Sequence, residues 1–162
     1  MTEDRKVEGF FETMSIAANI QLGTLATGIN PLSVISLSEA RELAKRWGER
    51  LAIRAINPSA KVIELSGGNQ QKVVIAKSAV QKPKLIIFDE PTRGVDVGSI
   101  VDIHRFINEP AGTGMAVVLI SSYLPEILAL SDRILVARQG RIVEEMDSRH
   151  ATEQKIMFAA VH

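Results

Sequence analysis

The sequence predicts an α/β fold in which a helical region precedes a parallel-sheet core. Three observations carry this prediction. Apolar residues recur at helical spacing in the first half of the chain, whereas bounded apolar runs of strand length occupy Leu85–Phe88 and Ala116–Ile120. The helical pattern Val97–Asn108 lies between these runs, which makes a strand, a crossover helix and a strand of the right-handed βαβ type.

The composition is that of a single globular domain, with 162 residues of which 46% are apolar and 23% charged. Nineteen Lys and Arg residues balance nineteen Asp and Glu residues, so a large basic surface for nucleic acid is not expected. The lack of cysteine excludes disulfides, thiolate metal sites and cysteine nucleophiles. The longest apolar run, Met115–Ile120, is too short to span a bilayer, and no signal peptide is recognised. We therefore expect a soluble domain of a reducing compartment.

The first third of the chain is predicted to be helical. Ser15 is expected to cap a short helix, and Gly23–Pro31 has the Gly, Thr, Asn and Pro content of a loop. Ser36 and Glu39 fit a capping box, in which each side chain bonds the backbone N–H of the other residue. The helix that follows should bury one stripe, formed by Leu37, Ala40, Leu43, Ala44, Trp47 and Leu51. We interpret Trp47 as a packing residue of that stripe.

The second half of the chain alternates strands and helices. The runs Leu85–Phe88 and Ala116–Ile120 lack polar residues, so we expect helices to cover both faces of their sheet. Pro110 and Gly112 should end the helix between them. A hairpin with a Gln139-Gly140 turn and a last helix complete the prediction, at Ile134–Ala137, Ile142–Glu144 and roughly Thr152–Val161.

A glycine-rich turn, Leu65–Gln71, precedes a predicted helix over Lys72–Gln81. The adjacent residues Gly67 and Gly68 leave backbone N–H groups uncovered, Ser66 adds a hydroxyl donor, and the start of a helix adds positive dipole. Together these features suit the oxygens of a phosphate group. A tight connection that simply needs glycine dihedrals is the alternative at this point.

Two carboxylates follow the first strand directly. Ligand chemistry in open α/β sheets takes place at the carboxyl ends of the strands, where Asp89 and Glu90 are expected. One carboxylate would hold Mg²⁺ and the other would orient or deprotonate an attacking water. The alternative is a helix-capping Asp89 and a solvated Glu90.

The two motifs, in this order, resemble the nucleotide-binding domain of an ABC transporter. Leu65–Gln71 resembles the signature motif of that family, Leu85–Thr92 its Walker B strand with the catalytic glutamate, and Gly94–Asp96 its D-loop. The Asn-Gln-Gln ending of the signature and the run Asp89–Gly98 are similar to the second ATPase domain of bacterial ribose, xylose and galactose importers.

The resemblance covers nearly the whole chain and implies its domain organisation. Residues 1–162 would form a partial P-loop NTPase (ABC ATPase) domain, with a helical subdomain that carries the signature over 7–82 and the remaining α/β core over 83–162. The sequence contains no Gly-Lys dipeptide and hence no P-loop. We expect a fragment of a larger ATPase, inactive without its P-loop.

The resemblance also implies two sets of site residues, because two such domains sandwich two ATP molecules head to tail. One set would meet the terminal phosphate of the partner domain's ATP: Ser66, Gly67, Gly68 and Asn69. On this domain's own ATP, Asp89 would hold Mg²⁺ and Glu90 would act as the catalytic residue. Asp96 would lie at the seam between the two sites.

Two positions depart from the family pattern. Ser122 takes the place of a histidine that contacts the terminal phosphate, and serine lacks the charge and reach of an imidazole. Glu3 takes the place of a glutamine that senses Mg²⁺, and an ionised carboxylate cannot donate a hydrogen bond. Both departures weaken the expectation that this domain's own site is catalytically competent.

The resemblance implies a second nucleotide-binding domain and sugar permease subunits as partners, no nucleic acid, and a place at the cytoplasmic face of the membrane. Two alternatives are a non-catalytic module that docks a permease and the head of a DNA-repair ATPase; the zero net charge argues against the latter. A sheet without its first strands would have an exposed edge, which we expect a second copy or a rearranged amino terminus to cover. The three histidines, His104, His150 and His162, lack the spacing of zinc ligands.

Overall fold

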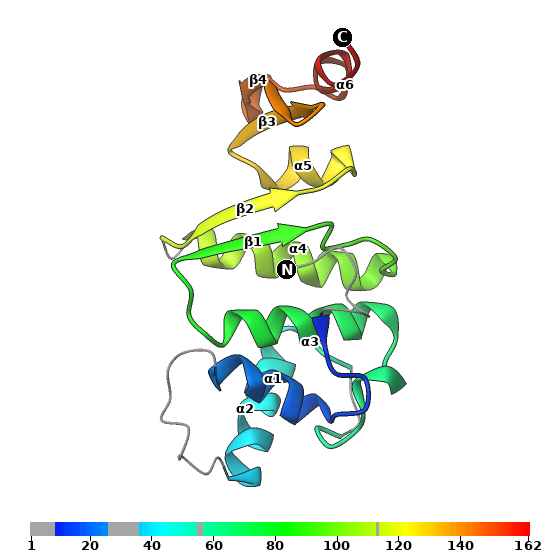
Figure 1. Ribbon diagram of the computed structural model, residues 1–162, viewed down its shortest axis with the longest axis vertical. Coiled ribbons are helices and arrows are strands. Elements are labelled where there is room, and N and C mark those ends of the chain that lie inside the picture. The colour runs from blue at the N-terminus through cyan, green and yellow to red at the C-terminus, as the bar shows by residue number, and fades with distance from the viewer. Residues whose placement is uncertain (1–8, 26–35, 55–56, 113) are drawn as a thin grey trace. The chain divides into compact units, whose positions relative to one another are not determined.

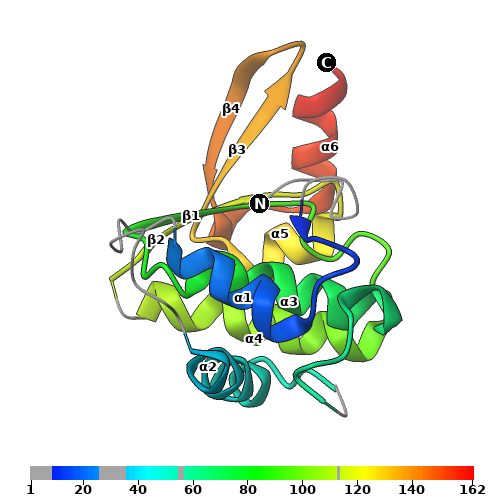
Figure 2. The same ribbon diagram turned by 60° about the horizontal axis from the view of Figure 1, so that its bottom comes forward.

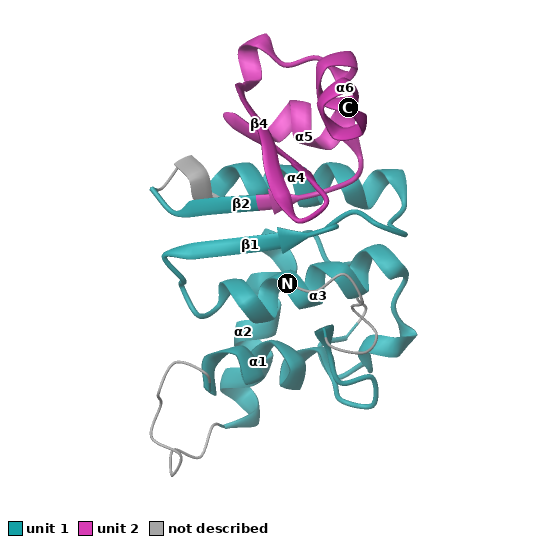
Figure 3. Cartoon of the chain, turned by 45° about the horizontal axis from the view of Figure 1, so that its top comes forward, with its two compact units in different colours: residues 1–118 teal, residues 119–162 magenta. Residues whose placement is uncertain are grey.

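The computed structural model of the protein describes residues 9–25, 36–54, 57–112 and 114–162. Two compact units make up the chain, unit 1 (Met1–Val118) and unit 2 (Leu119–His162), which Figure 3 distinguishes by colour. The predicted division into 7–82 and 83–162 stays a prediction. The elements, shown in Figure 1, are α1 (Ile16–Leu25), α2 (Leu37–Arg50), η2 (Val62–Glu64), α3 (Gly67–Ala79), β1 (Leu85–Asp89), α4 (Val97–Gly112), β2 (Ala116–Ile120), α5 (Leu124–Leu130), β3 (Arg133–Arg138), β4 (Arg141–Asp147), η3 (Ser148–His150) and α6 (Glu153–Val161).

Side-chain caps lie at the N-termini of the first two helices of unit 1. The Ala18 N–H donates to Ser15 Oγ (3.1 Å) at the start of α1, which confirms the predicted cap. Ser36 Oγ accepts from the Glu39 N–H (3.1 Å), and the Glu39 carboxylate accepts from the Ser36 N–H (3.2 Å). This reciprocal pair confirms the predicted capping box of α2.

The predicted stripe of α2 is buried only from its second turn onward. Ala40, Ala44 and Leu51 are buried, whereas Leu37, the first residue of the helix, is 77% exposed. Trp47 is half-buried and packs edge-on against Phe106 of α4, with ring centroids 6.2 Å apart. The packing role of Trp47 therefore holds, and the expected burial of Leu37 is wrong.

The helix α3 begins earlier than predicted, at Gly67 in place of Lys72. Ser66 is extended (φ −62°, ψ 156°) and its C=O accepts from the Gln70 N–H (2.9 Å), which closes the first helical turn over the glycine pair. The prediction placed Gly67 and Gly68 in a turn that precedes the helix. The structure instead places both glycines in the first turn of the helix.

The strands β1 and β2 form a two-stranded sheet and point the same way in Figure 1, as predicted for a parallel core. Ile86 and Phe88 of β1 are buried, but Leu85 and Ile87 are 49% and 45% exposed. Successive strand residues point to opposite faces, and Figure 2 shows α1, α3 and α4 on one side of β1. The prediction that helices cover both faces is therefore wrong: among the described residues of unit 1, helices cover only one face of β1.

Unit 2 is built on the predicted hairpin and last helix. β3 and β4 pair antiparallel, and Gln139 (φ 49°) and Gly140 (φ 74°) form the turn between them. Its core contains Ile127, Ile134, Val136 and Ile156. Across the part of the chain that the structure describes, no helix has the length and apolar character needed to cross a membrane.

Candidate functional site

Three segments that the sequence singled out reach the same end of unit 1. β1 ends at Asp89, α3 begins at Gly67 and α4 begins at Val97. In Figure 1 all three of these ends lie at the right-hand side of the unit. The carboxyl ends of strands are the usual ligand-binding edge of an α/β sheet. The predicted glycine motif and acidic pair are thus placed at one edge of one unit.

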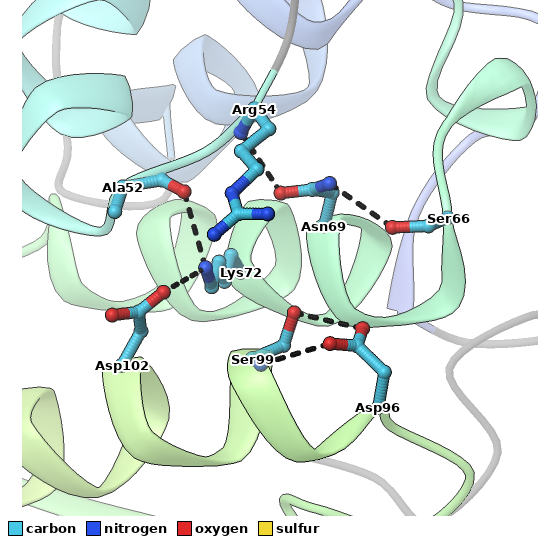
Figure 4. A network of polar contacts seen from close by, with 8 residues as sticks. All are labelled: Ala52, Arg54, Ser66, Asn69, Lys72, Asp96, Ser99 and Asp102. Atoms are coloured by element: carbon cyan, nitrogen blue, oxygen red, sulfur yellow. Dashed lines mark hydrogen bonds and ion pairs between the residues drawn. The ribbon is translucent and has the colours of Figure 1, made fainter.

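The start of α3 presents a hydroxyl held by a buried amide. Ser66 Oγ accepts from Asn69 Nδ2 (3.0 Å), and Asn69 Oδ1 accepts from the Arg54 N–H (2.9 Å), as Figure 4 shows. Asn69 is buried and Ser66 is exposed. Since the Ser66 oxygen already accepts a bond from Asn69, its own proton is available to an outside acceptor.

The backbone at the start of α3 adds further donors. The first amides of a helix have no acceptor within the helix, and here they belong to Gly67 and Gly68. Although Ser66 occupies the N-cap position, its side chain accepts no bond from the helix backbone. The positive end of the helix dipole, these amides and the Ser66 hydroxyl together suit a phosphate oxygen.

The N-terminus of α4 is capped by the side chain of Asp96. Asp96 Oδ1 accepts from the Ser99 N–H (3.0 Å) and Asp96 Oδ2 accepts from Ser99 Oγ (2.9 Å). These two bonds are the main reason why the pKa of Asp96 lies below its ordinary value. The helix-capping role that we considered for Asp89 is therefore filled by Asp96.

The two helix starts touch through Gly68. A Cβ atom at this position would collide with Ser99 Oγ and Cβ and would lie 2.7 Å from Asp96 Oδ2. Gly68 is therefore required for close approach of α3 to α4, whatever else it binds. The alternative of a tight connection that needs glycine dihedrals is not met, because both glycines lie in α3 and neither has a positive φ. Gly68 is needed for packing between helices.

The end of β1 places both predicted carboxylates in half-buried positions. Glu90 has φ 46°, the left-handed region that non-glycine residues rarely adopt. The Arg93 N–H donates to the Glu90 C=O (3.2 Å), which closes a turn around the buried Pro91. Backbone strain of this kind gathers at functional sites, where it directs a side chain.

Asp89 supplies the type of ligand that Mg²⁺ prefers, a carboxylate at a half-buried strand end. Within residues 9–25, 36–54, 57–112 and 114–162, no three acidic or histidine side chains gather into a complete metal site. Mg²⁺ commonly takes one or two carboxylates and fills its remaining positions with water and phosphate oxygens. A single carboxylate such as Asp89 is compatible with a coordination sphere of that kind.

Two further residues were predicted for the site. Ser122 follows β2 in unit 2, where it is exposed. Glu3 lies outside the described residues.

Sequence reasoning missed the buried residue Lys72, whose Nζ lies 2.6 Å from Asp102 Oδ2. A lysine followed by the apolar run Val73–Ala76 was the only signal for it, and Asp102 gave none.

Comparison with known proteins gives relatives over nearly the whole chain. The family model for ABC transporters matches residues 3–93. The ribose import ATP-binding protein RbsA of Caldanaerobacter subterraneus subsp. tengcongensis is 42% identical over 161 residues, which are 99% of this chain and 32% of that protein. The xylose import ATP-binding protein XylG of Moorella thermoacetica is 45% identical over 160 residues, 98% of this chain and 31% of that protein. The chain thus spans about a third of the length of these curated relatives.

Solved structures of similar fold are ABC cassettes. The dimeric bacterial ABC transporter cassette MJ0796 has a TM-score of 0.73 at 22% identity, over 88% of this chain and 60% of that one. MJ1267, an ATP-binding cassette of an ABC transporter, has a TM-score of 0.73 at 25% identity, over 94% of this chain and 67% of that one. The predicted α/β fold of an ABC ATPase domain is confirmed. The family model matches more than half of the sequence, and the chain belongs to the ABC transporter family.

Proposed function

We propose that this chain is part of the ATP-binding and ATP-hydrolysing subunit of a sugar ABC importer. The observation that carries the proposal is the presence of a donor-rich helix start and the acidic end of β1 at the same end of unit 1. The names of the ribose and xylose import ATP-binding proteins support a sugar as the cargo.

The start of α3 would act on an ATP molecule held by a second nucleotide-binding domain. The Ser66 hydroxyl and the Gly67 and Gly68 amides would donate to its terminal phosphate, and Asn69 would hold the Ser66 oxygen in place. Donors that are fixed before the reaction stabilise the charge that develops on a transferring phosphoryl group. The dimeric cassette among the structural relatives supports such a partner.

The end of β1 would act on the ATP bound by this domain. Glu90 would orient the attacking water and accept its proton, and Asp89 would bind Mg²⁺. Bound Mg²⁺ neutralises phosphate charge during phosphoryl transfer. Asp96 would lie at the seam between the two sites, and Ser122 and Glu3 would take the places of the family's histidine and glutamine.

The proposed subunit would work at the cytoplasmic face of the membrane with sugar permease subunits, and the helical part, residues 7–82, would contact them. Dimerisation of this chain through an exposed edge of the sheet also remains a proposal.

The catalytic role of Glu90 can be tested in a longer ATP-binding protein that carries these residues. We expect Glu90→Gln to slow ATP hydrolysis about 10²–10⁴-fold and to leave nucleotide binding unchanged, since the amide cannot accept the proton. Glu109→Gln is the matched control, because Glu109 is an exposed carboxylate in the last part of α4. An unchanged rate in the Glu90 variant would assign catalysis to the other ATP site.

The 162-residue chain by itself should hydrolyse ATP negligibly, because its sequence has no P-loop to bind the phosphates. Steady turnover by the purified chain that disappears in Glu90→Gln would contradict this expectation.

A further inference from the structure

A buried ammonium group ties three segments of unit 1 together. The Lys72 side chain is 1% exposed, and its Nζ donates to Asp102 Oδ2 (2.6 Å) and to the Ala52 C=O (3.1 Å), as Figure 4 shows. Lys72 lies in α3, Asp102 in α4 and Ala52 in the segment after α2. Burying a charge is costly unless it is paired and hydrogen-bonded, and Lys72 meets both conditions.

The ion pair lies one helical turn inward from the contact between the two helix starts. Lys72 follows Gly68 by one turn of α3, and Asp102 follows Ser99 by about one turn of α4. Gly68 permits close approach but offers no side chain that could resist sliding of one helix along the other. The Lys72–Asp102 pair supplies such a directional link between α3 and α4.

The same network reaches the Ser66 hydroxyl by a second branch. The segment that gives its Ala52 C=O to Lys72 also gives its Arg54 N–H to Asn69, which in turn donates to Ser66 Oγ. Lys72 and Asn69 thus hold the same short segment through its backbone. The charge of Lys72 also contributes to the lowered pKa of Asp96, after the two bonds from Ser99.

We propose that Lys72 is a positioning residue that fixes the register of α3 against α4 and thereby holds the phosphate-binding start of α3 in place. The part of this proposal that concerns phosphate rests on the proposed function. The part that concerns register does not. Lys72 itself, at 1% exposure, does not touch a ligand.

Variants that lack Lys72, Asp102 or both separate the positioning role of this ion pair from its contribution to stability. Asp102→Leu leaves the ammonium buried without its counter-charge, so we expect the unfolding constant to rise about 10²–10³-fold. Lys72→Met should have a smaller effect, because the Asp102 side chain is 20% exposed and can be hydrated. The double variant removes both charges, and its stability should return to within about tenfold of the original, since paired apolar replacements are often neutral.

The experiment uses the 162-residue chain, the two single variants, the double variant and a control that lacks an exposed ion pair, Arg133→Met with Glu145→Leu. Urea unfolding reports stability, and nuclear Overhauser contacts between Gly68 Hα and the Ser99 side chain report helix register. Titration with inorganic phosphate, followed by the Gly67 and Gly68 amide signals, reports the start of α3.

We expect the double variant to fold, to lose the Gly68–Ser99 contacts and to lose the saturable response to phosphate, while the control keeps both. A double variant with unchanged Gly68–Ser99 contacts and an unchanged response to phosphate would overturn the proposal. The double variant gives this test even if the single variants do not fold. If the unaltered chain gives no response to phosphate, the phosphate part of this proposal fails, whereas the proposed function, in which a second domain holds the ATP, is judged by the Glu90→Gln experiment. Loss of the Gly68–Ser99 contacts in the double variant would still support the register role.

Discussion

The helices α3 and α4 begin at the same end of unit 1 but differ in how their N-termini are capped. At α4, both oxygens of Asp96 accept bonds from Ser99, so the helix start is closed by the protein itself. At α3, the N-cap Ser66 gives its oxygen to the Asn69 side chain and leaves the helix backbone uncapped. A cap stabilises a helix, whereas an uncapped start retains donors for a ligand. This contrast is the basis for our proposal that α3 provides the donors of the site and that α4 supports it.

Among the substitutions at the two helix starts, a side chain at Gly68 should give the largest effect on stability. In Gly68→Ala the new Cβ collides with Ser99, so the free energy of unfolding should fall by about 1–3 kcal/mol, as for other overpacked positions. Gly48→Ala is the matched control, because a Cβ there meets no atom within 4 Å and alanine favours the helix by up to about 1 kcal/mol. Urea unfolding of both variants measures the difference. Equal stabilities would mean that α3 and α4 do not approach so closely.

Removal of each N-cap side chain tests the contrast itself. Asp96→Ala should lower the unfolding midpoint, because the Ser99 N–H loses its acceptor. Ser66→Ala should cost less, because Ser66 does not cap its helix and the variant loses only the bond from the Asn69 side chain. Thermal or urea unfolding ranks the two variants. The reverse order would show that α3, and not α4, depends on its cap.

Lowering the pH should produce the smallest of these effects on stability. The pKa of Asp96 in the folded chain is below its ordinary value of 3.8, so its contribution to stability is present above that value and is lost as pH falls through the folded pKa. The difference in stability between the original chain and Asp96→Asn should therefore shrink from neutral pH to about pH 3. A difference that stays constant over this range would exclude ionic capping by Asp96.

In unit 2, Arg149 lowers the pKa of Asp147 to about 2. The stability that Asp147 contributes should be present above pH 3.8 and decline toward pH 2, with the same sign as for Asp96. Asp147→Asn, measured over the same pH range, should abolish this decline and leave that of Asp96 unchanged. Loss of both declines would show that the two carboxylates are not independent.

Features that depend on neighbouring residues could be predicted from the sequence. The Ser15 cap, the Ser36–Glu39 capping box and the Gln139-Gly140 turn each involve residues within one turn of each other. The order of the glycine motif and the acidic pair along the chain likewise indicated the family, which the comparisons confirm. Each of these signals comes from residues that are close together in the sequence, so it does not depend on how the rest of the chain folds.

Features that depend on contacts between residues far apart in the chain could not be predicted from the sequence. The first turn of α3 contains two glycines that local propensity assigns to a turn, and contact of Gly68 with Ser99 outweighs that propensity. The buried position of Lys72 depends on Asp102 and Ala52, which no local pattern connects to it. The exposed face with Leu85 and Ile87 depends on which helices the chain places beside β1.

The most direct test of the contrast between the two helix starts is an NMR titration of the 162-residue chain with inorganic phosphate. We expect saturable shifts of the Gly67 and Gly68 amide signals and no shift at the Ser99 amide, which already donates to Asp96. Shifts at Ser99 equal to those at the glycines, or no shift at the glycines, would contradict the assignment of the phosphate site to α3.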